Sequence, residues 1–280
     1  MSQPPASLMW RDPRFHGMDL FRAELTDYAY SRHFHDTYVV AVGRNTGYRF
    51  NCERGSYTAP PGTIVLINPG EVHDGRSVDG RALSYRSMYP TRELFAEVAR
   101  AIGRRFEPIF PKRVIDDPSL ADLLSRAHAG LEQSPRSLAA QELLIQALTI
   151  LVNRHAEAAD RDPALHDHPA AVSRARAFLE DHVTEAVSLD DLSDASEISP
   201  FHLLRIFHAT LGLPPHQYLL NLRIQRAQTR LARGESIAQV ALECGFSDQS
   251  HLNRCFKRVL GITPGRYRSN FVQDGRSTSS

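Results

Sequence analysis

The feature that most constrains the fold of this chain is an internal sequence repeat in its C-terminal part. The two copies span residues 188–218 and 236–267. Equivalent positions lie 48 apart at the start of the unit and 49 apart from Leu203 and Leu252 onward, so the second copy has one extra residue. Each copy predicts a short helix, a tight turn and a second helix. This is the arrangement of a helix-turn-helix unit, in which the second helix reads DNA.

Start signals support the first helix of each unit. Ser236 and Gln239 have the spacing of a capping box, in which a hydroxyl and a longer side chain satisfy each other's backbone N–H groups. Ser188 and Asp191 form a weaker version of the same pattern.

The second helices have their own signals. Ser199 before Pro200 predicts an N-cap followed by the first helical residue, because proline lacks an N–H that would be unpaired there anyway. Ser247 and Asp248 predict a hydroxyl cap and a carboxylate at the positive end of the other helix. Gly212 then suits a left-handed C-cap.

Helical spacing separates an inner from an outer face in both predicted recognition helices. The residues expected to face the core are Leu203, Ile206, Phe207 and Leu211 in the first, and Leu252, Phe256 and Leu260 in the second. The residues expected to face outward are His202, Leu204, Arg205 and His208 in the first, and Gln249, Ser250, Asn253, Arg254 and Lys257 in the second.

Charge agrees with this interpretation only locally. The whole chain has a formal net charge of +1, whereas residues 199–269 contain ten Arg or Lys and three Asp or Glu, an excess of seven positive charges. Such an excess suits phosphate contacts and a salt-dependent affinity. Arg223, Arg226 and Arg230 fit either a phosphate-binding face or an ordinary solvated one.

These motifs resemble the DNA-binding domain of AraC-type (arabinose-operon-type) transcription regulators over about 100 residues. The resemblance rests on Ser199-Pro200-x-x-Leu203-x-Arg205-x-Phe207 and on Gly245-Phe246-Ser247-Asp248-Gln249-Ser250-x-Leu252-x-Arg254. Glu197 departs from the pattern, since the second copy has glycine there. The resemblance implies two recognition helices joined by a long helix, here about residues 217–232. It also implies base-facing roles for Phe201, His202, Leu204 and Arg205 and for Gln249, Ser250, His251 and Arg254, with Lys257 on phosphate.

The length of 280 residues predicts two domains, α+β in total. We expect a sensing and dimerisation domain at 1–159, a linker at 160–169 and an all-α double helix-turn-helix domain at 170–280. The linker is polar and carries Pro163 and Pro169. Because the chain has three scattered cysteines and neither an apolar run long enough for a membrane nor a secretory signal, we expect a cytoplasmic protein.

Residues 26–89 have the short, Gly/Pro-punctuated β-branched runs of a sandwich or barrel. His33-Phe34-His35, Pro61-Gly62-Thr63 and Pro69-Gly70-Glu71-Val72-His73 resemble a cupin-like β-barrel, the sensor domain of AraC-type regulators. Three helices should flank it, at 91–104, 118–133 and 137–158.

Three histidines are the candidate chemical groups of this barrel. His33 and His35 share one strand face, and with His73 they could contact an effector, hold a metal ion or serve only the structure. The glutamate that metal-binding cupins usually place after His-x-His is missing, so we expect no metal and no cofactor. Tyr38 is either an effector contact or, like Phe34, a core aromatic.

The helix at 137–158 is apolar on more than one face, which predicts burial on two sides. One side would be the barrel and the other a second subunit, although a helix wedged into a monomer core fits too. On the dimer interpretation, replacing Leu148 or Leu151 with Glu should give a monomer.

We therefore expect a sequence-specific DNA-binding transcription regulator, not an enzyme, that responds to a small molecule. Its expected partners are double-stranded DNA, the effector and a second copy of the chain, with RNA polymerase as a further candidate. Two alternatives stay open: a cupin-type metalloenzyme that uses the three histidines, and an effector-independent DNA-binding dimer.

Overall fold

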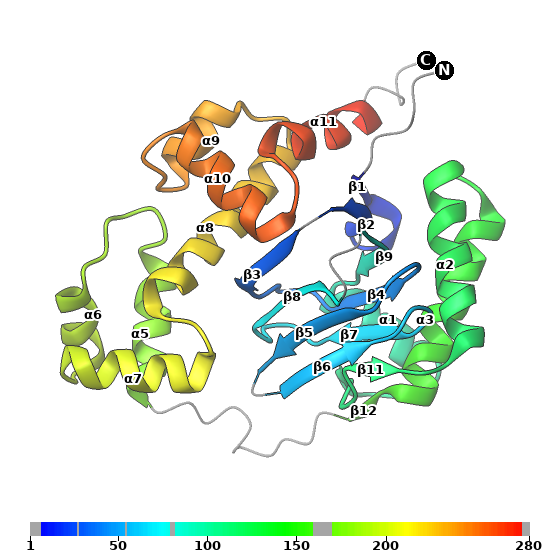
Figure 1. The fold of residues 1–280 in the computed structure, drawn as a ribbon, viewed down its shortest axis with the longest axis horizontal. Helices are drawn as coiled ribbons and strands as arrows, with labels where there is room; N and C mark the ends of the chain where they lie inside the picture. The colour runs from blue at the N-terminus through cyan, green and yellow to red at the C-terminus, as the bar shows by residue number, and fades with distance from the viewer. Residues whose placement is uncertain (1–6, 27, 54, 79–81, 159–169, 276–280) are drawn as a thin grey trace. The chain divides into compact units, whose positions relative to one another are not determined.

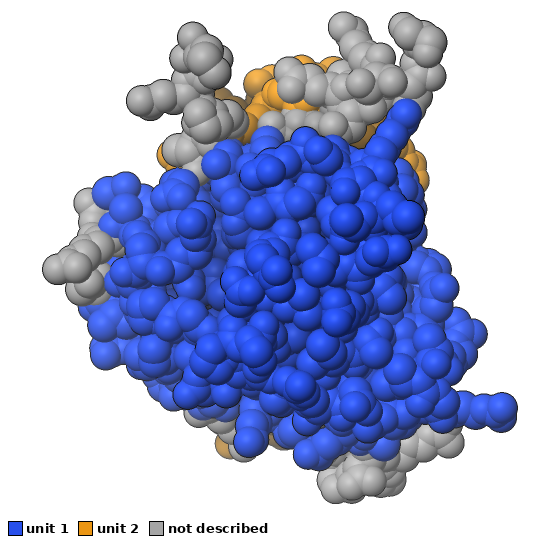
Figure 2. Space-filling view, turned by 90° about the vertical axis from the view of Figure 1, so that its right-hand side faces the viewer, with its two compact units in different colours: residues 1–29, 34–160 blue, residues 30–33, 161–280 orange. Residues whose placement is uncertain are grey.

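The computed structural model describes residues 7–275 except 27, 54, 79–81 and 159–169. The chain divides into two compact units, 1–29 with 34–160 and 30–33 with 161–280 (Figure 2). The predicted linker at 160–169 lies outside the described residues. No helix of the described chain has the length and hydropathy to cross a membrane.

The N-terminal part is built on two main sheets (Figure 1), beside a short pair of strands, β10 Pro108–Ile109 and β12 Glu157–Ala158. The first has the order β1-β2-β9-β4-β7-β11, with β1 Leu8–Asp12, β2 Met18–Leu25, β9 Leu83–Tyr89, β4 Val39–Gly43, β7 Ile64–Ile67 and β11 Val114–Ile115. The second has the order β3-β8-β5-β6, with β3 Ala29–His33, β8 His73–Ser77, β5 Tyr48–Cys52 and β6 Gly55–Ala59. The expected β-rich N-terminal domain is confirmed, and β1 and β2 extend it upstream of residue 26.

Strand β7 shows how the sheets are layered. All four of its residues are buried. Ile64 and Leu66 join a core shared with the helices, whereas Val65 and Ile67 join a smaller core with Phe50 of β5. Because successive side chains point to opposite faces of a strand, β7 lies in a middle layer between the helices and the second sheet.

Three helices cover the outer face of the six-stranded sheet, α1 Arg92–Ala101, α2 Pro118–Gln133 and α3 Leu138–His155. Helix α3 packs against both α1 and α2. Leu148 and Leu151 have no exposed surface in the single chain. Their prediction as dimer-breaking positions is therefore wrong, because a Glu there would disrupt the monomer core. Leu138 (69% exposed) and Ile145 (42% exposed) are the large apolar side chains that α3 leaves at its surface.

The C-terminal unit is helical, with α5 Ala170–Asp181, α6 Leu189–Ser196, α7 Pro200–Leu211, α8 Pro215–Ala232, α9 Ile237–Glu243, α10 Gln249–Leu260 and α11 Pro264–Gly275. Helices α6 and α7 form the first helix-turn-helix unit, and α9 and α10 form the second. Helix α8 contacts both units, so it is the predicted linking helix.

Candidate DNA interface and effector site

The turn of the first unit rests on a residue in a conformation that favours glycine. Glu197 has φ 59 and ψ 32, the left-handed region, and ends α6. For a residue with a Cβ this conformation costs about 1–2 kcal/mol. Arg174 fixes the turn by donating to the Ser196 carbonyl (2.6 Å) and pairing with the Glu197 carboxylate (3.2 Å).

The turn of the second unit has Gly245 at the equivalent position, with φ +79. A Cβ there would lie 2.9 Å from both Arg223 Nε and the Thr184 carbonyl oxygen. Both the backbone angle and the neighbours therefore require glycine.

The caps of the first helices reverse the expected ranking. Ser188 and Asp191 form a complete capping box, and their hydrogen bonds hold the pKa of the Asp191 carboxyl below its usual value. Ser236 accepts from the Gln239 N–H, but the Gln239 side chain donates to Glu243 instead of returning to Ser236.

The caps of the recognition helices also differ from the expectation. Ser199 is the N-cap of α7, but its side chain makes no capping hydrogen bond. In α10 the cap is Asp248 rather than Ser247, and its carboxylate accepts from the His251 N–H at 2.7 Å. This bond lowers the pKa of Asp248. Ser247 is thus the extra residue of the second copy.

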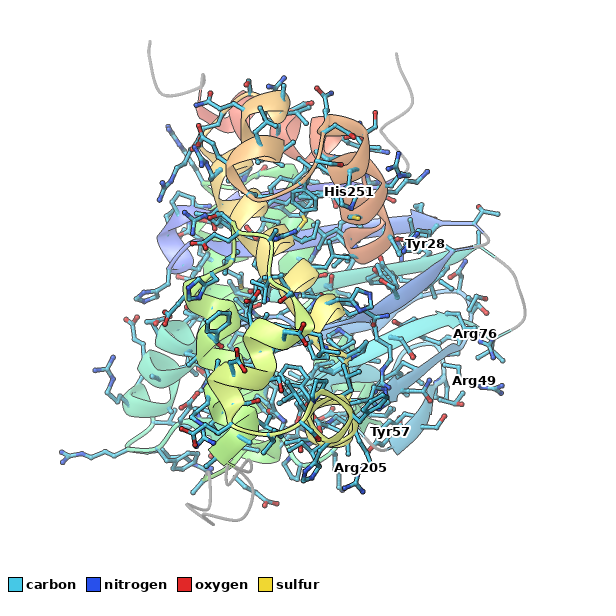
Figure 3. All side chains as sticks on the ribbon, turned by 90° about the vertical axis from the view of Figure 1, so that its left-hand side faces the viewer. Tyr28, Arg49, Tyr57, Arg76, Arg205 and His251 are labelled. Atoms are coloured by element: carbon cyan, nitrogen blue, oxygen red, sulfur yellow. The ribbon has the colours of Figure 1, made fainter. Side chains whose placement is uncertain are left out.

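The outward face of α7 is as the sequence predicts. Leu203 and Phe207 are fully buried, and His202, Leu204, Arg205 and His208 are exposed. Phe201, at the second helical position, is 88% exposed. Arg205 extends from the helix (Figure 3) and makes no ion pair with another described residue.

The outward face of α10 is polar. Leu252, Phe256 and Leu260 are buried, whereas Gln249, Ser250, Arg254 and Lys257 are exposed. His251 is held closer to its own domain, because its ring packs edge-on against Phe246 at 5.4 Å and its Nδ1 lies 3.2 Å from Ser247 Oγ. Asn253, which the sequence analysis placed outward, is half-buried.

Two of the three arginines on α8 act within their own domain. Arg223 donates to the carbonyls of Val183 (2.8 Å) and Glu185 (2.6 Å). Arg230 forms ion pairs with Glu235 and Glu243, which joins the end of α8 to α9. Arg226 is exposed. Of these three arginines, Arg226 therefore remains a candidate for phosphate contact, and Arg223 and Arg230 do not.

In the sheet-rich part, the structure brings the three predicted histidines together. One ring nitrogen from each of His33, His35 and His73 lies within 4.8 Å of the others. The Nδ1 atoms of His33 and His73 face the carbonyls of Ser31 (2.7 Å) and Glu71 (3.0 Å). Since a carbonyl oxygen only accepts, these Nδ1 atoms donate, and in a neutral ring Nε2 is then the atom with the lone pair.

His73 is uncharged at neutral pH. Burial lowers its pKa to about 4, against the smaller opposing effect of the hydrogen bond to Glu71. A neutral imidazole can accept a hydrogen bond from a ligand or coordinate a metal ion. The donor set suits a divalent transition metal in ligand type, although it lacks a carboxylate.

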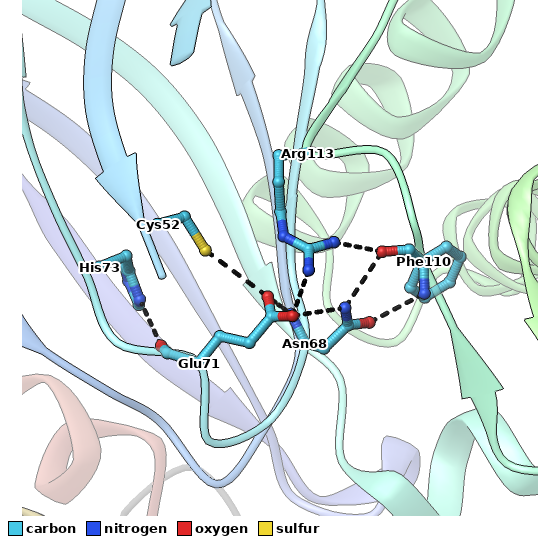
Figure 4. Close-up of polar contacts among 6 residues, drawn as sticks. All are labelled: Cys52, Asn68, Glu71, His73, Phe110 and Arg113. Carbon is cyan, nitrogen blue, oxygen red and sulfur yellow. Dashed lines mark hydrogen bonds and ion pairs between the residues drawn. The ribbon is translucent and has the colours of Figure 1, made fainter. Parts of the chain in front are cut away.

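A buried polar network positions His73 (Figure 4). The Glu71 carboxylate accepts from the Asn68 N–H (2.9 Å) and side-chain amide (3.0 Å), and it pairs with Arg113. Asn68 also exchanges two hydrogen bonds with the backbone of Phe110. The loop between β7 and β8 is thereby tied to the segment before β11.

Comparison with known proteins assigns the chain to a family. A family model described as an AraC-like ligand binding domain matches residues 15–148, and one described as a helix-turn-helix domain matches residues 192–270. The uncharacterized HTH-type transcriptional regulator YbfI of Bacillus subtilis is 30% identical over 244 residues, which cover 86% of this chain and 87% of YbfI. The chain belongs to the AraC-type transcription regulators.

Other relatives extend this comparison. The HTH-type transcriptional activator RhaS of Escherichia coli is 27% identical over 247 residues, covering 84% of this chain and 86% of RhaS. ToxT from Vibrio cholerae shares the fold, with a TM-score of 0.55 and 14% identity over 91% of this chain and 97% of ToxT. A ToxT structure with bound unsaturated fatty acid has a TM-score of 0.54 at 15% identity, covering 96% of this chain and 97% of ToxT.

This AraC-type regulator departs from the sequence-based site at two aromatic positions. Tyr38 lies in the core shared with the helices, where its OH donates to the Pro108 carbonyl (2.7 Å) and its ring packs on Phe95 and Phe110. Its role as an effector contact is withdrawn. Tyr89, which the sequence analysis did not select, packs against His35 at 5.2 Å between ring centroids. Only the pairing of β9 with β2 and the turn before α1 place it there.

Proposed function

We propose that α7 and α10 enter successive major-groove segments of one DNA duplex. Phe201, His202, Leu204 and Arg205 would face bases in the first segment. Gln249, Ser250 and Arg254 would do so in the second, with the half-buried His251 beside them, and Lys257 would meet phosphate. The observation that carries the proposal is the pair of recognition helices, each with a buried apolar face and an exposed face that bears an arginine.

The test is a selection of operators from random duplexes with the full-length protein, followed by binding titrations at several salt concentrations. We expect one preferred sequence with two half-sites about one helical turn apart, and an affinity that falls steeply with salt. A protein that binds all duplexes alike, or none, would refute the proposal.

We further propose that an effector contacts His35 and His73, with Tyr89 beside them and His33 in the same cluster. A neutral His73 whose Nε2 accepts favours an uncharged ligand with hydroxyl donors over a carboxylate. The bound fatty acid in ToxT supports a sensor role for this fold, although its chemistry differs.

A thermal-shift screen of small metabolites tests this site, because a ligand that binds only the native state raises the unfolding temperature. We expect a hit whose effect is lost in His73→Phe and kept in His216→Phe, an exposed control on α8. If zinc or nickel alone gives the largest shift and elemental analysis finds the metal bound, the three histidines form a metal site instead.

Homodimerisation through α3 remains a proposal, now with different residues. Leu138 and Ile145 are exposed and share one face of the helix. Replacing both with Glu should leave the core intact and shift the protein to a monomer in sedimentation. A double variant that stays dimeric would place the interface elsewhere. Contact with RNA polymerase and a cytoplasmic location also stay predictions.

A further inference from the structure

The exposed faces of the two recognition helices differ in chemistry. On α7, two apolar side chains are exposed, Phe201 at 88% and Leu204 at 38%. On α10, every large apolar side chain among the described residues is buried, and the exposed positions are polar or charged. The same fold element thus presents a partly apolar surface in one module and a polar surface in the other.

Phe201 does not serve the fold of its own domain. Its neighbours Leu203 and Phe207 fill the core of the module, whereas Phe201 points away from it. It is also the second residue of α7, and the N-terminal part of a recognition helix is the part that meets base edges. Its exposure therefore falls where DNA contact is expected.

The major groove offers one apolar group on its base edges, the C5-methyl of thymine. Building on the proposed DNA-binding function, we propose that the first module recognises thymine methyl groups through Phe201 and Leu204. Arg205 follows on the same helix face and is placed for a neighbouring guanine. The second module reads its half-site by hydrogen bonds alone.

Helix geometry limits which thymines are involved. Residues three apart share a helix face and differ by about 4.5 Å along the axis. Base pairs are stacked about 3.4 Å apart. Phe201 and Leu204 therefore reach methyl groups on adjacent or next-adjacent base pairs. The neighbouring Arg205 supplies a positive charge that attracts the helix to the negatively charged DNA, which brings Phe201 and Leu204 close to the bases.

A uracil scan of the selected operator tests the inference, since uracil lacks only the methyl group. Each thymine is replaced in turn, and affinity is measured for the wild type, Phe201→Ala, Leu204→Ala and Leu242→Ala. Leu242 is a matched control, because it is 66% exposed but lies on α9. All three substituted side chains are exposed, so the circular dichroism and melting of the variants should match those of the wild type.

We expect the affinity of the wild-type protein for the operator to fall about fourfold when one or two particular thymines of one half-site are replaced by uracil. That loss should disappear in Phe201→Ala or Leu204→Ala and persist in Leu242→Ala. Thymines of the other half-site should be insensitive to both variants.

The inference is overturned if no thymine effect depends on Phe201 or Leu204, or if the first half-site contains no thymine. In either case a preferred operator would still uphold the proposed function, which fails only when sequence-specific binding is absent. If Phe201→Ala leaves DNA binding unchanged but weakens binding of another protein to the operator complex, Phe201 serves a protein contact instead.

Discussion

The two helix-turn-helix modules have the same fold but very different local support. The second has glycine at its left-handed turn, Gly245, and a carboxylate cap on its recognition helix, Asp248. The first forces Glu197 into the left-handed region and leaves Ser199 without a capping bond. The comparison teaches that a module can tolerate local strain when its core, here Leu203 and Phe207, is complete.

The largest expected effect comes from a side chain in the turn of the second module, because it would give that turn the strain that Glu197 causes in the first. Gly245→Ala should destabilise that module by about 2–3 kcal/mol. The new Cβ would lie too close to the Thr184 carbonyl oxygen, and alanine would have to adopt a positive φ. Native-state hydrogen exchange of α9 and α10 amides measures the loss. Equal protection in variant and wild type would show that the turn relaxes without cost.

Arginine removal compares the modules as DNA readers. Arg205→Ala and Arg254→Ala should each cost about 1–3 kcal/mol of binding and relax preference at one base position, in different half-sites. Lys257→Ala should weaken all sequences alike and reduce the salt slope by about one. If both arginine variants lower affinity uniformly, these arginines hold phosphate rather than read bases.

Cap removal should affect the modules unequally. Asp248→Ala should lower the stability of α10, whereas Ser199→Ala should leave α7 almost unchanged, because only Asp248 accepts a capping bond. The Asp248 contribution also has a pH signature. Its pKa is lowered on folding, so the stabilisation is complete above the unfolded pKa and is lost as pH falls through the folded value.

Amide exchange of α7 and α10 at neutral pH and well below about pH 4 separates the two caps. A wild-type α10 that keeps its full protection in acid would contradict the role of Asp248.

The smallest expected effect has the opposite sign. Glu197→Gly should stabilise the first module by about 0.5 kcal/mol, because relief of the left-handed strain slightly exceeds the added entropy of the unfolded chain. The lost ion pair with Arg174 reduces the gain, since exposed pairs contribute little. A lower melting temperature in this variant would mean that the Arg174 contact outweighs the strain.

Periodicity and caps predicted the four helices of the two helix-turn-helix units and most of the inner and outer faces of α7 and α10, whereas α5 and α11 were not predicted. They assigned the cap of α10 to Ser247, which is wrong, because both residue types cap helices and only the geometry shows that Asp248 bonds. The three histidines were found as a group, whereas the sequence left Tyr38 open between an effector contact and a core position, and the structure places it in the core. Turn residues between His35 and β4 reset the alternation of side chains, and no sequence pattern reveals that.

The broad apolar surface of α3 fitted either a second subunit or a wedge in the monomer core. The structure buries much of this surface, Leu148 and Leu151 included, in the core with α1 and α2. A sequence shows that an apolar helix face must be buried. It does not show which element covers that face, because the hydrophobic effect is non-directional and any apolar surface will do.

The Glu71 network gives the histidine cluster a mechanical consequence. His73 is hydrogen-bonded to the Glu71 carbonyl, and the Glu71 carboxylate contacts both Arg113 and Asn68. Asn68 in turn is hydrogen-bonded to the backbone of Phe110. Phe110 in turn packs against both Tyr38 and Phe95 of α1. If the proposed effector contacts His73, a shift of His73 would either break hydrogen bonds of this network or move Phe110 with it. Because Phe110 packs on Phe95 of α1, binding at the histidines would then change the position of a helix.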